Sequence, residues 1–180
     1  HLKDVTINSN IKFSSDPEDI NSSDYIFIAV PTNSLRDLFN NIKIPKSSNI
    51  ISLSKGIEKN TQFFPSQIIR DCTDYSDKSI CVLSGPSHAE EVSKGIPTAV
   101  VVAGVNITLN KKVQELLSSP NFRAYSNSDI LGVEISGAVK NIISIASGIC
   151  IGLGFGDNTT AALISRGINE IVRLGSVLGA

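Results

Sequence analysis

The sequence predicts an α/β protein in which a mostly parallel sheet is followed by an all-helical segment. Up to about residue 128, short β-branched runs alternate with amphipathic segments that begin at capping residues. This alternation is typical of a parallel sheet flanked by helices. From Asp129 to Ala180 no strand pattern returns and helical periodicity runs almost unbroken. We therefore predict an α/β domain at 1–128 and part of a helical domain at 129–180.

The elements of the first part follow from local patterns. "YIFIAVP" is a continuous apolar run, as expected of a central strand covered on both faces. Asp16 can cap a short helix whose first position is Pro17. Apolar residues at helical spacing predict further helices. The strands are expected at 10–15, 25–31, 49–56, 79–86, 97–104 and 122–128, and the helices at 32–42, 62–72, 87–95 and 108–119.

Composition excludes several classes of function. Sixteen Lys and Arg against seventeen Asp and Glu give a net charge of −1, so no global field favours nucleic acid or an anionic membrane. Cys72, Cys81 and Cys150 lack CxxC spacing and have apolar neighbours, which favours reduced core thiols over a disulfide or a metal site. We expect no bound metal.

The termini and the longest apolar run indicate in which cellular compartment the protein is expected. The uncharged run 141–156 is rich in Gly and Ser and shorter than the roughly 20 apolar residues that cross a bilayer, so we expect no membrane span. No signal peptide is visible, which favours the cytoplasm. The chain contains no methionine and opens on His1, so we expect a piece of a longer protein.

Three motifs directly follow predicted strands: "AVPTNSL", "SLSKGIE" and "LSGPSHAEEV". In open α/β sheets, ligands bind beyond the carboxyl ends of the strands. Lys55 in the second motif could meet a phosphate or a carbonyl oxygen, or it could be a solvated loop lysine. In the third motif, Gly85, Ser87 and Ala89 leave space for a ligand, but they are also consistent with an ordinary tight turn that enters a helix.

Lys140 is the only charge between Glu134 and Asp157. On a helix, Ser136, Lys140, Ser144 and Gly148 form one weakly polar stripe, with aliphatic residues around it. We expect this helix to be buried. A buried ammonium is expensive, so Lys140 would pair with a carboxylate such as Glu134, extend to water, or serve as a proton donor in a site.

These motifs together resemble one enzyme family. "AVPTNSL", "SLSKGIE", "LSGPSHAEEVSKGIPTAVVVAG" and "SGAVKNIISIASGICIGLGFGDNTTAALISRGINEIVRLG" are similar, in order and spacing, to the bacterial-type NAD(P)-dependent glycerol-3-phosphate dehydrogenases. The resemblance spans nearly the whole chain. It implies that 1–128 is part of a Rossmann-like dinucleotide-binding domain and 129–180 part of a helical substrate domain.

The same resemblance implies roles for individual residues. Lys140 corresponds to the general acid and base on the C2 oxygen, and Asn141 to a residue that helps hold the substrate. Lys55 corresponds to a lysine shared by substrate and cofactor, Gly85 and Ser87 to substrate contacts, and Ala89 to a cofactor contact. The implied reaction is reversible hydride transfer between NAD or NADP and the pair dihydroxyacetone phosphate and sn-glycerol 3-phosphate, for glycerophospholipid synthesis. A homodimer is also implied.

The sequence departs from the family pattern at both ends. It has no G-x-G-x-x-G element, whose backbone seats the pyrophosphate, and it stops before a family segment that contacts the substrate phosphate. We therefore expect the isolated 180-residue chain to be inactive. The preference between NAD and NADP is left open. Two other readings also remain: a dehydrogenase for a 3-hydroxy acid or 6-phosphogluconate, and a non-catalytic binding module.

Overall fold

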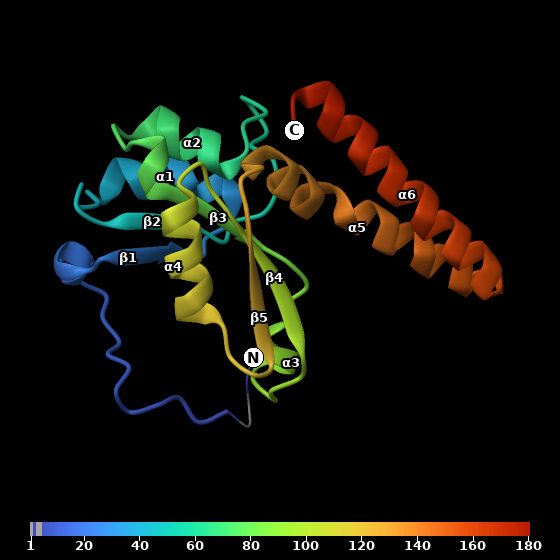
Figure 1. Cartoon of the computed structure of the whole chain (residues 1–180), viewed down its shortest axis with the longest axis horizontal. Helices are drawn as coiled ribbons and strands as arrows, with labels where there is room; N and C mark the ends of the chain where they lie inside the picture. Colours follow the sequence, from blue (N-terminus) through green and yellow to red (C-terminus); the bar gives the residue numbers. More distant parts are fainter. Residues whose placement is uncertain (1, 3–4) are drawn as a thin grey trace.

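The computed structural model describes residues 2 and 5–180, which form a five-stranded sheet flanked by helices and a long helical hairpin (Figure 1). The strands are β1 (Tyr25–Ile28), β2 (Asn49–Ser52), β3 (Ile80–Ser84), β4 (Thr98–Ala103) and β5 (Phe122–Asn127). The α-helices are α1 (Leu35–Asn41), α2 (Pro65–Cys72), α3 (Ala89–Val92), α4 (Ile107–Leu117), α5 (Ile130–Gly152) and α6 (Asp157–Leu178). Short 3₁₀ helices are η1 (Pro17–Ser22), η2 (Thr32–Ser34) and η3 (Asp77–Ser79).

The sheet has the order β1-β2-β3-β4-β5, and β1–β2, β2–β3 and β4–β5 are parallel pairs. This confirms the predicted mostly parallel α/β fold. The β3–β4 pair is antiparallel, which the sequence patterns did not predict. The connection between these strands contains only the four-residue α3, so it acts as a wide hairpin and not as a helical crossover. Because β1, β2 and β3 are parallel to one another, their carboxyl ends share one edge of the sheet.

Capping side chains start several of the helices, and the cap predicted at Asp16 is confirmed. The Asp16 carboxylate accepts from the Glu18 amide at the start of η1, and Pro17 takes the first position. Asn106 caps α4 by accepting from the Leu109 amide. Asp129 caps α5 in the same way, with the Gly132 amide as donor. Each cap satisfies an N–H group that has no partner within its helix.

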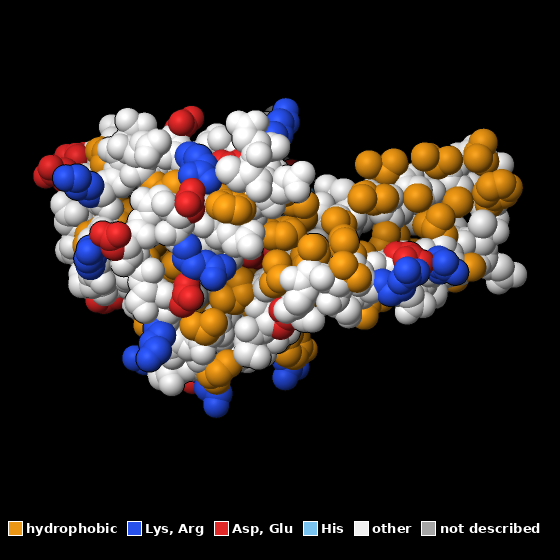
Figure 2. Space-filling view, turned by 90° about the horizontal axis from the view of Figure 1, so that it is seen from above, with side chains coloured by type: hydrophobic (Ala, Val, Ile, Leu, Met, Phe, Trp, Pro, Cys, Tyr) orange, Lys and Arg blue, Asp and Glu red, His pale blue; other side chains and the backbone are white. Residues whose placement is uncertain are grey.

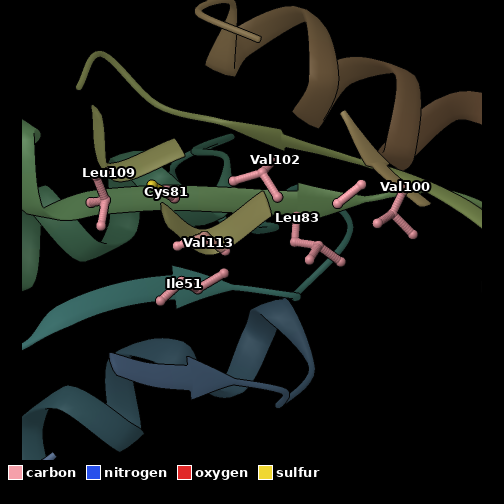
Figure 3. Close-up of a cluster of buried hydrophobic side chains, with 8 residues drawn as sticks. Ile51, Cys81, Leu83, Val100, Val102, Leu109 and Val113 are labelled. Carbon is pink, nitrogen blue, oxygen red and sulfur yellow. The ribbon is translucent and has the colours of Figure 1, made fainter. Parts of the chain in front are cut away.

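The sheet is buried on both faces. Successive residues of a strand point to opposite faces, and so Ile50 and Ile80 join a cluster with α1 and α2, whereas Ile51 and Cys81 join a cluster beneath α4. Figure 3 shows the second cluster, in which Val113 of α4 lies among the strand residues. The continuous apolar strand patterns are therefore explained by cover on two sides. All three cysteines are free thiols.

The strand predicted at 10–15 is wrong. These residues form no regular structure, and Ile11 and Phe13 are exposed. In Figure 1 the segment loops away from the sheet, and β1 is the edge strand. Alternating apolar residues favour a strand only where a neighbouring strand supplies hydrogen bonds, and this segment has no such neighbour among the described residues.

Helices α5 and α6 form an antiparallel pair that extends from the α/β layer as an arm (Figure 1). Figure 2 shows apolar side chains gathered on this arm. By length and composition alone, α5 could cross a membrane, since its best 18-residue window has a mean hydropathy of 1.5. Its first third nevertheless packs on β3 and β4 of the sheet.

Candidate functional site

A cleft of about 940 Å³ lies between the carboxyl end of β3, the helix α5 and the helix α6. Its lining is mostly apolar, with polar groups at the end nearest the sheet. The polar and small residues there are Ser84, Gly85, Asn127, Asp129, Ser136, Gly137, Lys140 and Ser144. The cleft therefore opens at the sheet edge where the strand-end motifs were expected to bind a ligand.

Lys55 follows β2 and reaches across to the loop after β3. Its Nζ atom donates a hydrogen bond to the Gly85 carbonyl oxygen at 2.9 Å. Partial burial lowers the pKa of Lys55, and the nearby positive charge of Lys140 lowers it further. The two lysines, 85 residues apart in the sequence, thus lie close enough for their charges to interact.

Gly85 lies where the chain leaving β3 touches β4. A Cβ atom at this position would lie 2.7 Å from the Ala99 carbonyl oxygen and 2.8 Å from Val100 Cα. Only glycine fits without moving backbone. The Ser87 hydroxyl is 3.5 Å from the Gly85 carbonyl oxygen, at the limit of a hydrogen bond. Gly85 therefore presents its carbonyl oxygen to both Lys55 and Ser87.

Lys140 lines the cleft together with Ser136 and Ser144, as the predicted stripe requires, whereas Gly148 lies outside it. The expectation that the helix and its lysine are buried is wrong. Lys140 is exposed, and the neighbouring Ile142 and Ile145 are 67% and 65% exposed. The reason is that α5 leaves the sheet after Gly137 and contacts mainly α6 from there on.

Helix α5 approaches the sheet most closely at Gly137. A Cβ atom there would lie 2.7 Å from Ser84 Oγ and 3.8 Å from Lys55 Cγ. Lys140 follows three residues later, almost one turn along the helix. The small residue at 137 therefore lets α5 bring Lys140 to the same edge of the sheet as Lys55.

Comparison with known proteins places this geometry in a family. Residues 1–110 match the family model for the N-terminus of NAD-dependent glycerol-3-phosphate dehydrogenase, and residues 129–180 match the model for its C-terminus. The chain belongs to the NAD-dependent glycerol-3-phosphate dehydrogenase family. The resemblance drawn from the four motifs is thereby confirmed.

Individual relatives agree with this assignment. The chain is 46% identical over 182 residues to the glycerol-3-phosphate dehydrogenase [NAD(P)+] of Clostridium perfringens, which covers 99% of the chain and 54% of the relative. The crystal structure of glycerol-3-phosphate dehydrogenase from Coxiella burnetii is similar, with a TM-score of 0.86 and 33% identity over 100% of this chain and 55% of that one. The structure of glycerol-3-phosphate dehydrogenase GPD1 from yeast is also similar, with a TM-score of 0.85 and 26% identity over 98% of this chain and 53% of that one. The chain spans about half the length of these glycerol-3-phosphate dehydrogenases.

The structure brings four of the six predicted site residues of this chain together: Lys55, Gly85, Ser87 and Lys140. Asn141 is linked to them through Lys140, whose Nζ atom donates to Asn141 Oδ1 at 3.1 Å. Ala89 begins α3 beyond Ser87, is exposed, and is not among the described residues that line the cleft.

Sequence reasoning missed the way in which α5 is attached to the α/β layer. Glu134 was considered as a partner for Lys140, but its oxygens accept from the Ser66 amide at 2.8 Å and from the Ser66 hydroxyl at 2.7 Å. Burial raises the pKa of Glu134. A carboxylate in an otherwise apolar helix is a signal of a buried partner, but nothing in the sequence shows that the partner is 68 residues away.

Proposed function

We propose that the protein containing this chain catalyses reversible hydride transfer between NAD(P)H and dihydroxyacetone phosphate, with sn-glycerol 3-phosphate as product. The observation that supports this most directly is the convergence of two lysines from different parts of the chain. Lys140 lines the cleft, and Lys55 binds the carbonyl oxygen of Gly85, a cleft residue, close enough to Lys140 for the two charges to interact. Two ammonium groups suit a substrate that carries a phosphate and develops further negative charge during reduction.

In this proposal Lys140 is the general acid and base. When the C2 carbonyl is reduced, its oxygen takes the bonding electron pair, and the Lys140 ammonium donates the proton that completes the hydroxyl group. In the oxidation of glycerol 3-phosphate, the neutral amine accepts the same proton. Lys140 is exposed to water and lines the cleft, so a substrate bound in the cleft can reach its ammonium group.

Lys55, Gly85, Ser87 and Asn141 are assigned to substrate binding. Lys55 is oriented by the Gly85 carbonyl, which accepts one of its three protons and leaves two for the substrate and the cofactor. Ser87 adds a hydroxyl on the same loop. Asn141 holds the Lys140 ammonium from the side, and its amide nitrogen remains free to donate to a substrate oxygen.

The residues present fit part of a dinucleotide cofactor. The hydroxyl oxygens of Thr32, in η2 after β1, and of Ser52, at the carboxyl end of β2, are buried without a hydrogen-bond partner among the described residues, as expected at a polar ligand site. Lys55 and Ala89 would contact the cofactor on the other side. Bound NADH or NADPH supplies the hydride.

We further propose that the enzyme acts in the cytoplasm as a homodimer and supplies glycerol 3-phosphate for glycerophospholipid synthesis. Support for a role of α5 in the substrate domain, as opposed to a membrane, comes from Glu134, whose buried carboxylate binds the α/β layer. A charged group with such a partner would be expensive to move into lipid.

The test is an activity assay on the full-length protein. We expect oxidation of NADH or NADPH that depends on dihydroxyacetone phosphate, and none with a 3-keto acid or ribulose 5-phosphate plus CO2, the substrates of the alternative dehydrogenases in the reductive direction. The isolated 180-residue chain should be inactive, because the remaining contacts must offset the entropy of association without the glycine-rich cradle. Absence of activity in the full-length protein would contradict the proposal.

A further inference from the structure

Helix α5 is held to the α/β layer by a short contact region. Glu134, Ile135 and Gly137 are buried there, and the rest of the helix, which ends at Gly152, contacts mainly α6. Ile135 is only 1% exposed and supplies the apolar part of this contact. The direction in which α5 leaves the sheet, and hence the position of Lys140, depends on these few residues.

The polar part of the contact is a matched pair. Glu134 is 7% exposed and Ser66 1% exposed. Each Glu134 carboxylate oxygen receives one hydrogen bond, from the Ser66 amide at 2.8 Å and from the Ser66 hydroxyl at 2.7 Å. Because the acceptor is a carboxylate and water is excluded, these bonds are stronger than neutral ones.

Ser66 is itself fixed in position. It lies in the first turn of α2, where Arg70 donates to its carbonyl oxygen at 3.2 Å and to its hydroxyl oxygen at 3.1 Å. Arg70 also lies 3.6 Å from Asp77. The charge of Arg70 acts on Glu134 as well and favours the ionised carboxylate, against the larger effect of burial. The pair therefore joins α5 to a rigid part of the α/β layer.

Glu134 cannot act on the substrate directly. It lies six residues before Lys140, which places the two side chains about 120° apart around the helix axis. Its carboxylate also points to α2, and Glu134 is not among the described residues that line the cleft. Any effect on catalysis must pass through the orientation of α5.

We propose that Glu134 is a positioning residue: through its bonds to Ser66 it fixes the orientation of α5 and so holds Lys140 beside Lys55. This inference rests on the proposed function of Lys140. It explains why a buried carboxylate occurs in this helix at all, although its burial is unfavourable. A displacement of the order of 1 Å at the lysine would be enough to lower turnover markedly.

The experiment compares three variants of the full-length protein with the wild type: Glu134→Ala, Glu134→Gln and Ser66→Ala. Glu134→Ala should lower kcat about tenfold or more and leave KM for the nicotinamide cofactor within about twofold, since the cofactor contacts lie on the α/β layer. Glu134→Gln should restore most of kcat, because its amide oxygen can accept from the Ser66 amide and its NH2 can donate to the Ser66 hydroxyl. The kcat of Ser66→Ala should lie between the values of these two variants. Glu115→Ala, on the exposed face of α4, is the matched control.

A folded Glu134→Ala variant with wild-type kcat would overturn the inference, as would a Glu134→Gln variant that loses as much kcat as Glu134→Ala. If Glu134→Ala does not fold, Ser66→Ala decides, and unchanged kcat in that variant overturns it.

A second readout separates this inference from the proposed function. Hydrogen exchange of the amides at 130–140 should be faster in Glu134→Ala than in the wild type, whether or not the protein reduces dihydroxyacetone phosphate. If the wild type lacks activity but exchange is faster in Glu134→Ala, the proposed function is wrong and the role of the Glu134–Ser66 contact in holding α5 is supported. Unchanged exchange in Glu134→Ala contradicts that role.

Discussion

The Lys55 ammonium group lies 2.9 Å from the Gly85 carbonyl oxygen, so the loop after β2 is joined to the loop after β3. This bond uses a backbone acceptor and leaves the charge of Lys55 without a carboxylate partner among the described residues. A lysine that is oriented but not neutralised remains available to an anionic substrate. The loop after β3 is confined by close packing of Gly85 against β4, which holds the carbonyl oxygen that binds Lys55 in a fixed position.

Replacing Lys140 with methionine in the full-length enzyme should lower kcat by about a hundredfold or more, because the proton for the C2 oxygen is then lost. The affinity for NADH or NADPH should change little. Steady-state kinetics and cofactor titration by fluorescence give both quantities. Lys112→Met, on the exposed side of α4, serves as the control. More than about a tenth of wild-type kcat in Lys140→Met would contradict a proton-transfer role of this size.

The pKa of Lys55 should rise in the Lys140→Met variant. Burial and the positive charge of Lys140 both lower this pKa in the wild type. Removing the charge eliminates the smaller cause, so the pKa should move up while burial keeps it below its ordinary value. NMR titration of isotope-labelled lysine measures it directly. An unchanged Lys55 pKa would mean that the two lysines do not interact in solution.

Gly85→Ala should destabilise the protein by about 1–3 kcal/mol, because the new methyl group overlaps backbone atoms of Ala99 and Val100 that cannot rotate away. Urea unfolding gives the change in the free energy of unfolding. Ser93→Ala, at an exposed position in the same connection, should stay within about 0.5 kcal/mol of the wild type. Equal effects from both substitutions would show that the close approach at Gly85 is absent.

Glu58 should make the free energy of unfolding depend on acidity. Arg36 donates to both of its oxygens, and this interaction lowers the pKa of Glu58 below 4.5. A carboxyl group with a lowered folded pKa stabilises the native state above its unfolded pKa, and this contribution disappears as the pH falls through the folded pKa. Glu58→Gln should therefore be less stable than the wild type at pH 7 and approach it in strong acid. Denaturation at several pH values, with Glu115→Gln as control, tests this, and a difference that is constant with pH would refute it.

Much of the site could be predicted from one rule. Residues that follow parallel strands meet at one edge of the sheet, and this rule already selected Lys55, Gly85 and Ser87 before their contacts were known. The change from strand pattern to helical periodicity at Asp129 likewise predicted the start of α5, which begins at Ile130. The rule does not apply to β4, which is antiparallel to β3. The direction of β4 depends on the short connection that precedes it and not on the pattern of residues in the strand.

Local pattern also failed where burial depends on distant parts of the chain. The apolar residues around Lys140 predicted a buried helix, yet Ile142, Ile145 and Ile149 are exposed. Residues 10–15 have a strand pattern, but no strand lies beside them in the part of the chain that the structure describes. Hydrophobic periodicity specifies which face of an element prefers contact. It does not specify whether the described chain supplies a contact there.

The sequence by itself determined the order of strands and α-helices from residue 25 onward, the cap at Asp16, the family and the residues that can carry charge at the sheet edge, because these depend on neighbouring residues and on spacing along one element. Only the tertiary structure decided that β4 runs antiparallel to β3, that Lys140 lies beside Lys55 in an open cleft, and that Glu134 binds Ser66 and not the lysine. These outcomes depend on contacts between residues far apart in the chain, and such contacts are chosen by how whole elements pack.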